Sequence, residues 1–384
     1  MGSRPGHLPA RPGRGASRTD GVHQALLGRW HTRDMAQRRP STLSEVARRA
    51  GVSVATASKA LNGRARVAED TRARVVQASE DLAFTPNPVA RSLFTGRTRT
   101  VGMLIRDTNV ERFALPLMLG AEDALTGIDL SLVVSDARGD RGRTDAMLRM
   151  LSQRKVDGVL IVGANTKIRS SVTHLMDVPV IYVYGESADP ADISHMPDDF
   201  GGAVQTVDHV VAAGRRRIAH LTGPRTSRAV QQRVEGIRSA LRNHNMRLTG
   251  PVVYGRWSQR WGREAGAELL RRNPLVDAVL CGSDQIAAGI VDALLDSGRR
   301  VPEDVAVTGY DNWVEFAGET DPLLTTVDMN LEALGAAAAH ELFDAIDGRP
   351  APGGVRRHPC TLLVRGSTPT APRSATRPHD GAAP

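Results

Sequence analysis

The chain has 384 residues, of which 41% are hydrophobic and 24% charged, a balance typical of a globular protein with one large domain or two smaller ones. No apolar run approaches the roughly 18 residues of a membrane span. The first 30 residues also lack the apolar core of a secretory signal, so we expect neither export nor a membrane partner. The two cysteines, Cys281 and Cys360, make neither a disulfide framework nor a zinc site. We therefore expect a protein of the reducing cytoplasm that holds no metal and no other cofactor.

The net charge is +8, and all of the excess positive charge lies in the first quarter of the chain. Residues 1–100 contain 18 Lys and Arg against 7 Asp and Glu, whereas the remainder contains 32 against 35. A basic disordered tail explains only part of this bias, because residues 41–100 still hold 10 basic and 5 acidic residues. The asymmetry indicates a polyanion-binding module joined to a neutral one.

The two ends of the chain are expected to be disordered. Residues 1–40 are rich in Gly, Pro and Arg and show no hydrophobic period, which predicts a basic extension without a core. The functional start is either Met1 or Met35, which lies just before the first patterned segment. Residues 367–384 have a similar composition and are predicted to form a disordered tail.

Residues 41–86 are predicted to form a helix-turn-helix domain without strands. Thr42 and Glu45 have the spacing of a capping box, in which each side chain bonds the other residue's backbone amide. Gly51 can end this first helix in a tight turn, and Ser53 can cap a second short helix. Two short helices joined by a Gly-containing turn form the motif that places its second helix in the DNA major groove.

The second helix is expected to run from Val54 to about Leu61, with Ala57 and Ala60 facing inward. Its outward positions are Val54, Ala55, Thr56, Ser58 and Lys59. Valine and alanine can contact thymine methyls, and Lys59 can reach a guanine edge or a phosphate. Any small helical bundle could share this pattern, but the capping, the turn and the charge bias together favour DNA binding.

From residue 100 onward, short β-rich apolar runs alternate with helical stretches. The first set is 101–105, 130–134, 156–162 and 178–184, and the second is 217–223, 277–282 and 304–310. This spacing predicts βαβ units and parallel sheets covered on both faces. A break near Pro197 divides them into two similar lobes, and a ligand is expected beyond the carboxyl ends of the strands, in the cleft between lobes.

Two stretches of the first domain resemble the N-terminal module of the lactose-repressor (LacI/GalR) family. They are TLSEVARRAGVSVATASKALNG (42–63) and TRARVVQASEDLAFTPNPVARSLFTGRT (71–98). The resemblance extends from about Ser41 to Gly366. It implies a small all-α helix-turn-helix DNA-binding domain plus hinge helix, joined to a two-lobed α/β periplasmic-binding-protein-like domain. The implied boundaries are 87–99 for the hinge, about 100–198 and 328–357 for the first lobe, and about 199–327 and 358–366 for the second, within a domain of 100–366.

The resemblance also implies which residues contact DNA. In the family, the segment matching 87–95 folds in the minor groove, and Leu93 matches the residue that wedges between base pairs and kinks the duplex. Leu93 could instead dock the linker on the core. The implied DNA-binding set is Thr42, Ser53, Val54, Ala55, Thr56, Ser58, Lys59, Asn62, Asn87, Ala90, Arg91 and Leu93.

The resemblance continues through the lobes, where 208–224 (DHVVAAGRRRIAHLTGP), 233–241 (RVEGIRSAL), 283–290 (SDQIAAGI) and 305–312 (VAVTGYDN) match family stretches. It implies an effector site made of Asp107, Asn109, Phe113, Tyr184, Arg233, Trp257, Asp284 and Asp311. Bidentate donors, carboxylates and aromatic faces suit a sugar or sugar derivative. Each polar residue could instead form a salt bridge or a cap at a loop, an alternative that is less favoured for Arg233 and Asp311.

We therefore expect a sequence-specific, nucleoid-associated transcriptional regulator, a repressor of carbohydrate uptake or catabolism genes controlled by a small molecule. It is expected to bind two-fold operator DNA as a homodimer. The alternatives are a co-repressor-type regulator that responds to a nucleobase or another metabolite, and a solute-binding protein. No enzymatic activity is expected, because the chain has no P-loop, GxSxG, strand-linked GxGxxG or HExxH motif.

Overall fold

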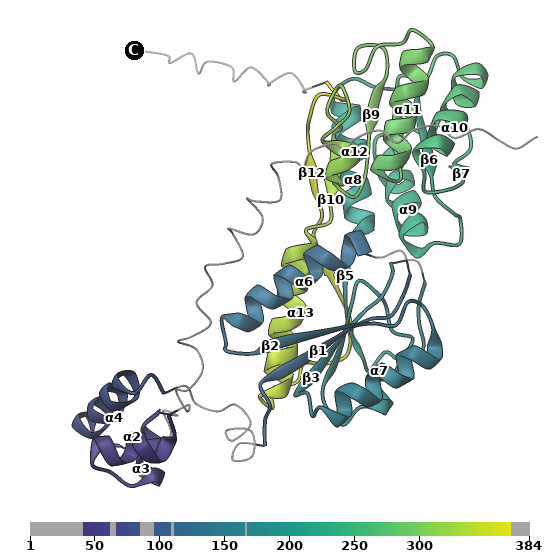
Figure 1. The fold of residues 1–384 in the computed structure, drawn as a ribbon. Helices are drawn as coiled ribbons and strands as arrows, with labels where there is room; N and C mark the ends of the chain where they lie inside the picture. The colour runs from purple at the N-terminus through teal and green to yellow at the C-terminus, as the bar shows by residue number, and fades with distance from the viewer. Residues whose placement is uncertain (1–40, 62–66, 85–95, 109–110, 166, 370–384) are drawn as a thin grey trace, which may run out of the picture. The chain divides into compact units, whose positions relative to one another are not determined.

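The computed structural model describes residues 41–61, 67–84, 96–108, 111–165 and 167–369. They belong to two compact units, one within residues 1–90 and the other within 91–384 (Figure 1). The expectations for the extension at 1–40, for the hinge segment at 85–95 and for the tail beyond 369 fall outside these residues. No helix within them is long and apolar enough to cross a membrane.

The described part of the first unit contains three helices, α2 (Leu43–Ala50), α3 (Val54–Leu61) and α4 (Glu69–Asp81). The expected capping box at the start of α2 is confirmed. Thr42 Oγ1 accepts from the Glu45 N–H at 3.3 Å, and the Glu45 carboxylate accepts from the Thr42 N–H at 2.7 Å. Gly51 ends α2 with a φ of +68°, a left-handed conformation that glycine adopts without strain.

The three helices pack on a core of small side chains. Its buried members are Val46, Ala47, Ala50, Ala57, Ala60, Val75 and Ala78. Alanines at the contacts let the helix backbones approach closely, so the helices pack around a small core. This packing uses the inner face of α3 and leaves its opposite face at the surface.

The first lobe of the second unit is a six-stranded parallel sheet of order β11-β5-β4-β3-β1-β2. Its strands are β1 (Thr100–Ile105), β2 (Ser131–Asp136), β3 (Gly158–Val162), β4 (Val180–Val183), β5 (Ile193–Pro197) and β11 (Gly354–His358). Helices α6 (Glu111–Thr126) and α13 (Leu331–Ile346) cover one face, α7 (Arg141–Gln153) covers the other, and a short 3-10 helix spans Thr173–Leu175. Strand β3 is buried on both faces, because Leu160 packs under α6 and α13 while Ile161 packs under α7.

The second lobe repeats this plan with a four-stranded parallel sheet of order β7-β6-β8-β9. Its strands are β6 (Ile218–Thr222), β7 (Val253–Tyr254), β8 (Ala278–Cys281) and β9 (Ala306–Thr308). Helices α8 (Asp199–Ala212) and α9 (Arg228–Asn243) pack on one face, α10 (Gln259–Arg272) and α11 (Asp284–Asp296) on the other, and α12 (Val314–Ala317) follows β9. All seven apolar runs expected to be strands are confirmed as strands of these sheets.

A separate antiparallel pair, β10 (Thr326–Asp328) with β12 (Thr361–Leu363), lies where the chain passes between the lobes. Just beyond β12, the predicted start of a disordered tail at residue 367 needs correction. Ser367 and Thr368 are buried, and the Ser367 hydroxyl donates to Val307 O at 2.6 Å. The folded region therefore extends past these two residues.

The close approach of α6 and α13 yields a first prediction. A Cβ at Gly120 would collide with the backbone carbonyl oxygen of Glu332, so Gly120→Ala must push the helices apart. We expect a loss of about 3 kcal/mol in the free energy of unfolding, measured by urea denaturation. Gly127→Ala is the matched control, because a Cβ there meets nothing nearer than 3.6 Å. Equal stability of the two variants would contradict this packing.

Candidate functional site

The outward face of α3 holds the described part of the expected DNA-binding set. Val54 is 46% exposed, and Ala55 and Lys59 are exposed as well, whereas Thr56 and Ser58 are half-buried. This face therefore offers small apolar groups beside one cation, a combination that can read thymine methyls and a guanine edge or phosphate.

Capping orders the start of α3. Ser53 Oγ accepts from the Thr56 N–H at 3.1 Å, and the two hydroxyl groups lie 2.8 Å apart. Thr42 caps α2 on the same domain. The remaining expected positions, Asn62, Asn87, Ala90, Arg91 and Leu93, lie outside the described residues.

A cavity of about 910 Å³ lies between the two lobes of the second unit. It sits beyond the carboxyl ends of strands from both sheets, where parallel sheets place their ligands. Six of the expected effector residues line it: Asp107, Phe113, Tyr184, Arg233, Trp257 and Asp311. Asn109 lies outside the described residues. We call this space the interlobe cavity.

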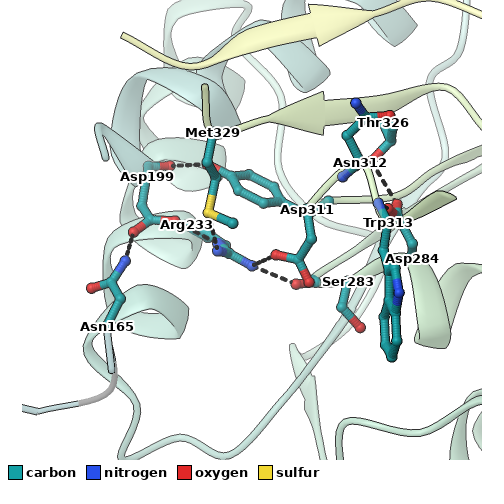
Figure 2. A network of polar contacts seen from close by, with 12 residues as sticks. Asn165, Asp199, Arg233, Ser283, Asp284, Asp311, Asn312, Trp313, Thr326 and Met329 are labelled. Atoms are coloured by element: carbon teal, nitrogen blue, oxygen red, sulfur yellow. Dashed lines mark hydrogen bonds and ion pairs between the residues drawn. The ribbon is translucent and has the colours of Figure 1, made fainter. Parts of the chain in front are cut away.

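Arg233 is the most buried cation of the cavity, at 3% exposure. Its Nε pairs with Asp199 Oδ1 at 2.7 Å, and its Nη1 donates to Gly282 O at 2.6 Å and lies 3.5 Å from Asp311 Oδ1. Figure 2 shows the guanidinium between the two carboxylates. Burial alone would lower the pKa of Arg233, but these carboxylates raise it above its ordinary value. Arg233 therefore stays charged, and most of its donors bond protein groups.

Asp311 joins the two lobes. Its Oδ2 lies 2.9 Å from Arg112 Nη2, which comes from α6 of the first lobe. The Arg112 guanidinium stacks 4.1 Å from the ring centroids of both Phe113 and Trp313. Asp311 has a φ of +101°, a strained backbone conformation of the kind that collects at functional sites. Burial raises the pKa of Asp311 above its usual value, against the opposing effect of Arg112 and Arg233.

A second ion pair lies on the first-lobe wall of the cavity. One carboxylate oxygen of Asp107 accepts from the Ala164 N–H at 2.9 Å, and the other pairs with the Arg169 guanidinium. Both oxygens of Asp107 thus bond groups of its own lobe.

Aromatic side chains supply the apolar surface of the cavity. Phe113 and Tyr184 lie with ring centroids 5.0 Å apart, and Trp257 and Trp313 approach from the second lobe. Trp257 also packs on the cores around β6 and β7, so it lines the cavity and contributes to packing. Trp261 packs on the same lobe without lining the cavity, as expected for a core residue. Such flat faces suit a sugar ring or another planar ligand.

Asp284 does not line the cavity, and the expectation that it contacts the ligand is corrected. Its side chain is fully buried, where Oδ2 accepts from the Trp313 N–H at 2.7 Å and Oδ1 accepts from the Thr326 hydroxyl at 2.5 Å. The buried Asp284 side chain therefore fixes the position of the Trp313 backbone. Its neighbour Gln285 lines the cavity instead.

Sequence reasoning missed several polar and aromatic residues of the cavity. They are Arg112, Asn165, Lys167, Arg169, Arg256 and Trp313. Each follows a strand end in a loop or at a helix start, so the rule that ligands bind beyond the carboxyl ends of strands could have selected them. No group of three or more His, Cys, Asp or Glu side chains that could hold a metal ion occurs in the described ranges.

Comparisons with known proteins give matches in both units. Residues 42–87 match the model of bacterial regulatory proteins of the lacI family, and residues 207–368 match that of a periplasmic binding protein-like domain. The chain is 35% identical over 328 residues to the HTH-type transcriptional regulator CelR of Thermobifida fusca, which covers 82% of this chain and 94% of that protein.

Two solved structures are similar to this chain over most of its length. A complex of the transcriptional regulator CelR with cellobiose has a TM-score of 0.60 at 31% identity and covers 86% of this chain and 100% of that one. The Lac repressor dimer bound to operator and the anti-inducer ONPF has a TM-score of 0.67 at 26% identity and covers 86% and 99%. These matches confirm the expected architecture of a helix-turn-helix domain followed by a periplasmic-binding-protein-like domain.

The buried carboxyl of Asp284 generates a pH prediction. Burial, with Asp311 nearby, raises the pKa of Asp284 from 3.8 to about 7. The folded state then keeps a proton that the unfolded chain has lost, so unfolding releases a proton between about pH 4 and 7. The free energy of unfolding should therefore fall as pH rises through this window, by at most about 1.4 kcal/mol per pH unit from this group.

Asp284→Asn should flatten this slope, because the amide does not titrate. Asp296→Asn, at the exposed end of the same helix, is the control and should keep the wild-type profile. Urea denaturation at a series of pH values measures both. A slope in Asp284→Asn equal to that of the wild type would show that Asp284 titrates normally.

Proposed function

The chain belongs to the LacI family of bacterial regulatory proteins, and we propose that it represses carbohydrate uptake or catabolism genes under the control of a sugar or sugar derivative. The proposal rests on the lining of the interlobe cavity, where aromatic side chains lie beside arginine–carboxylate pairs. The same chain also has a helix-turn-helix. Sugars present hydroxyl groups and apolar ring faces that such a wall complements. The cellobiose complex of the similar regulator supports a sugar as the ligand class.

A nucleobase or another flat metabolite acting as co-repressor is the second candidate. It is favoured by the four aromatic side chains of the cavity, Phe113, Tyr184, Trp257 and Trp313, which can stack on a planar ring. The two candidates predict opposite responses. An inducing sugar releases the operator, whereas a co-repressor strengthens operator binding.

At the DNA end, we propose that Val54, Ala55 and Lys59 read the major groove, with Thr42, Ser53, Thr56 and Ser58 in support. Asn62, Asn87, Ala90, Arg91 and Leu93 complete the proposed contacts, with Leu93 as the minor-groove wedge. Two such modules on a two-fold operator require a homodimer. Leu115 and Leu119, exposed one turn apart on α6, offer an apolar contact for it. Light scattering that gave only monomer at micromolar concentration would contradict the dimer.

We propose that the ligand signal reaches DNA through the linker at residues 96–99. Asp157 of the first lobe accepts from the Thr98 and Arg99 N–H groups at 3.0 and 2.7 Å, and Arg97 pairs with Asp347 at 2.9 Å. The linker end is thus fixed to the first lobe. A ligand that changes the arrangement of the lobes therefore alters where the linker starts, a coupling of typically about 1–3 kcal/mol. The chain acts in the cytoplasm, where its operator lies, without catalysis.

Substitutions on α3 and in the cavity should affect promoter binding and the ligand response separately. Lys59→Ala should weaken promoter binding by about tenfold, because it removes a cation from the face of α3 that meets DNA. Arg247→Ala, an exposed cation of the second lobe, is the matched control and should bind normally. Fluorescence anisotropy with the chain's own promoter DNA measures both.

Trp257→Ala should keep promoter binding but lose most of the response to a panel of mono- and disaccharides that includes cellobiose, because the ligand loses a stacking face. Trp257→Phe, which keeps an aromatic ring, should respond in between. A full sugar response in Trp257→Ala would place the effector elsewhere, and normal promoter binding by Lys59→Ala would exclude α3 as the reading helix.

A further inference from the structure

The interlobe cavity carries more positive than negative charge. Among the described residues, five cationic side chains and two carboxylates line it: Arg112, Lys167, Arg169, Arg233 and Arg256 against Asp107 and Asp311. A concave wall of one sign raises the local concentration of ligands of the opposite sign. The excess of positive charge therefore affects which ligands the cavity binds.

The two carboxylates are already paired. Asp107 bonds Arg169 and a backbone amide, and Asp311 bonds Arg112 and lies close to Arg233. The arginines are not saturated by these pairs, since Arg112 Nη1 and Arg169 Nε are buried without an acceptor. A buried N–H donor without an acceptor destabilises the folded protein. The carboxylates of the cavity therefore do not satisfy all of the arginine donors that line it.

Lys167 and Arg256 are the two cations that no carboxylate pairs with in the described part of the chain. Lys167 follows β3 in the first lobe, and Arg256 follows β7 in the second. Both side chains are exposed and line the cavity from opposite lobes. They therefore present positive charge to the cavity from both lobes.

On the premise of the proposed function, we infer that the effector is an anionic sugar, bearing a carboxylate or a phosphate, whose charged group is recognised by Lys167 and Arg256. Guanidinium and ammonium groups form their strongest hydrogen bonds with these two anions. The aromatic side chains contact the sugar ring, and the unpaired cations bind its charged group. A neutral sugar would use the rings and leave the excess charge without a partner.

Holding the lobes together is the competing role for these cations. It accounts for Arg112, which reaches Asp311 across the cavity, and for Arg228, which pairs with Glu186 of the other lobe at 2.6 Å. It does not account for Lys167 or Arg256, because neither meets a carboxylate of the opposite lobe in the described residues. Ligand recognition explains their position at the cavity.

The test, on the full-length chain, compares neutral sugars with counterparts that carry one anionic group. The pairs are glucose with glucuronate and glucose 6-phosphate, galactose with galacturonate, and ribose with ribose 5-phosphate, with inorganic phosphate as the anion alone. Thermal shift and calorimetry give affinity, and promoter anisotropy gives DNA release. At least one anionic sugar should bind more tightly than its neutral counterpart, and the affinity should fall as KCl rises. The uronate and phosphate arms distinguish the two anions.

Lys167→Gln and Arg256→Gln should each weaken binding of that anion by about tenfold or more, and should weaken binding of its neutral counterpart less. Arg260→Gln is the matched control, because it removes the same charge four residues along on the exposed surface of α10. It should bind the anion as the wild type does.

The inference is overturned if no anionic sugar, nor inorganic phosphate, stabilises the wild type more than the Lys167→Gln/Arg256→Gln double variant. In that case a neutral sugar that releases the promoter would leave the proposed function standing. If neutral sugars also change neither stability nor promoter binding, the proposed function fails as well.

Discussion

The architecture of the effector domain depends on one buried guanidinium, that of Arg233, held between the carboxylates of Asp199 and Asp311. The three charges come from the start of α8, from α9 and from the loop after β9, so a single network fixes three elements around the cavity. Removing the cation would leave the Asp199 carboxylate buried without a counter-charge and leave Asp311 with Arg112 alone, a change that costs about 3–5 kcal/mol. The network therefore sets the shape of the second-lobe wall, and because Asp311 also reaches Arg112, it sets the contact between lobes.

The Asp311 carboxylate is shared by Arg233 and Arg112, and this gives the domain a physical basis for switching between lobe arrangements. The Asp311–Arg112 pair is one of the contacts that join the lobes, and both of its side chains line the cavity, where a ligand would compete for them. A ligand that replaces or strengthens this link changes the relative stability of the lobe arrangements by its differential affinity. Since Asp157 ties the linker to the first lobe, we propose that this difference is carried toward the DNA-binding domain. Lys167 and Arg256 lie outside this network, and we propose that they recognise the charged group of the ligand.

Sequence patterns predict the strands that are built from apolar runs, whether they are central or, like β2, at an edge. They miss β5 (ISHMP), although it is fully buried, and β11 (GVRRH), an edge strand with alternating exposure, because both contain polar residues and no such run. Arg233 lines the cavity as expected, and its contact with a ligand stays a prediction. Its partner Asp199 lies 34 residues earlier, a pairing that no local pattern reveals. Asp284 was misassigned for the same reason, because Thr326, which bonds it, is 42 residues away. Lys167 and Arg256 lie in loops without periodicity.

We propose that the contact between the lobes controls operator affinity. A double-mutant cycle on Arg112 and Asp311 tests it most directly, with promoter dissociation constants measured without any effector for the wild type, Arg112→Gln, Asp311→Asn and the double variant. Because the pair spans the cavity as an inducing ligand would, each single change should tighten promoter binding, and the double variant should gain no more than the larger single effect. Four folded proteins with the same promoter affinity would contradict the account.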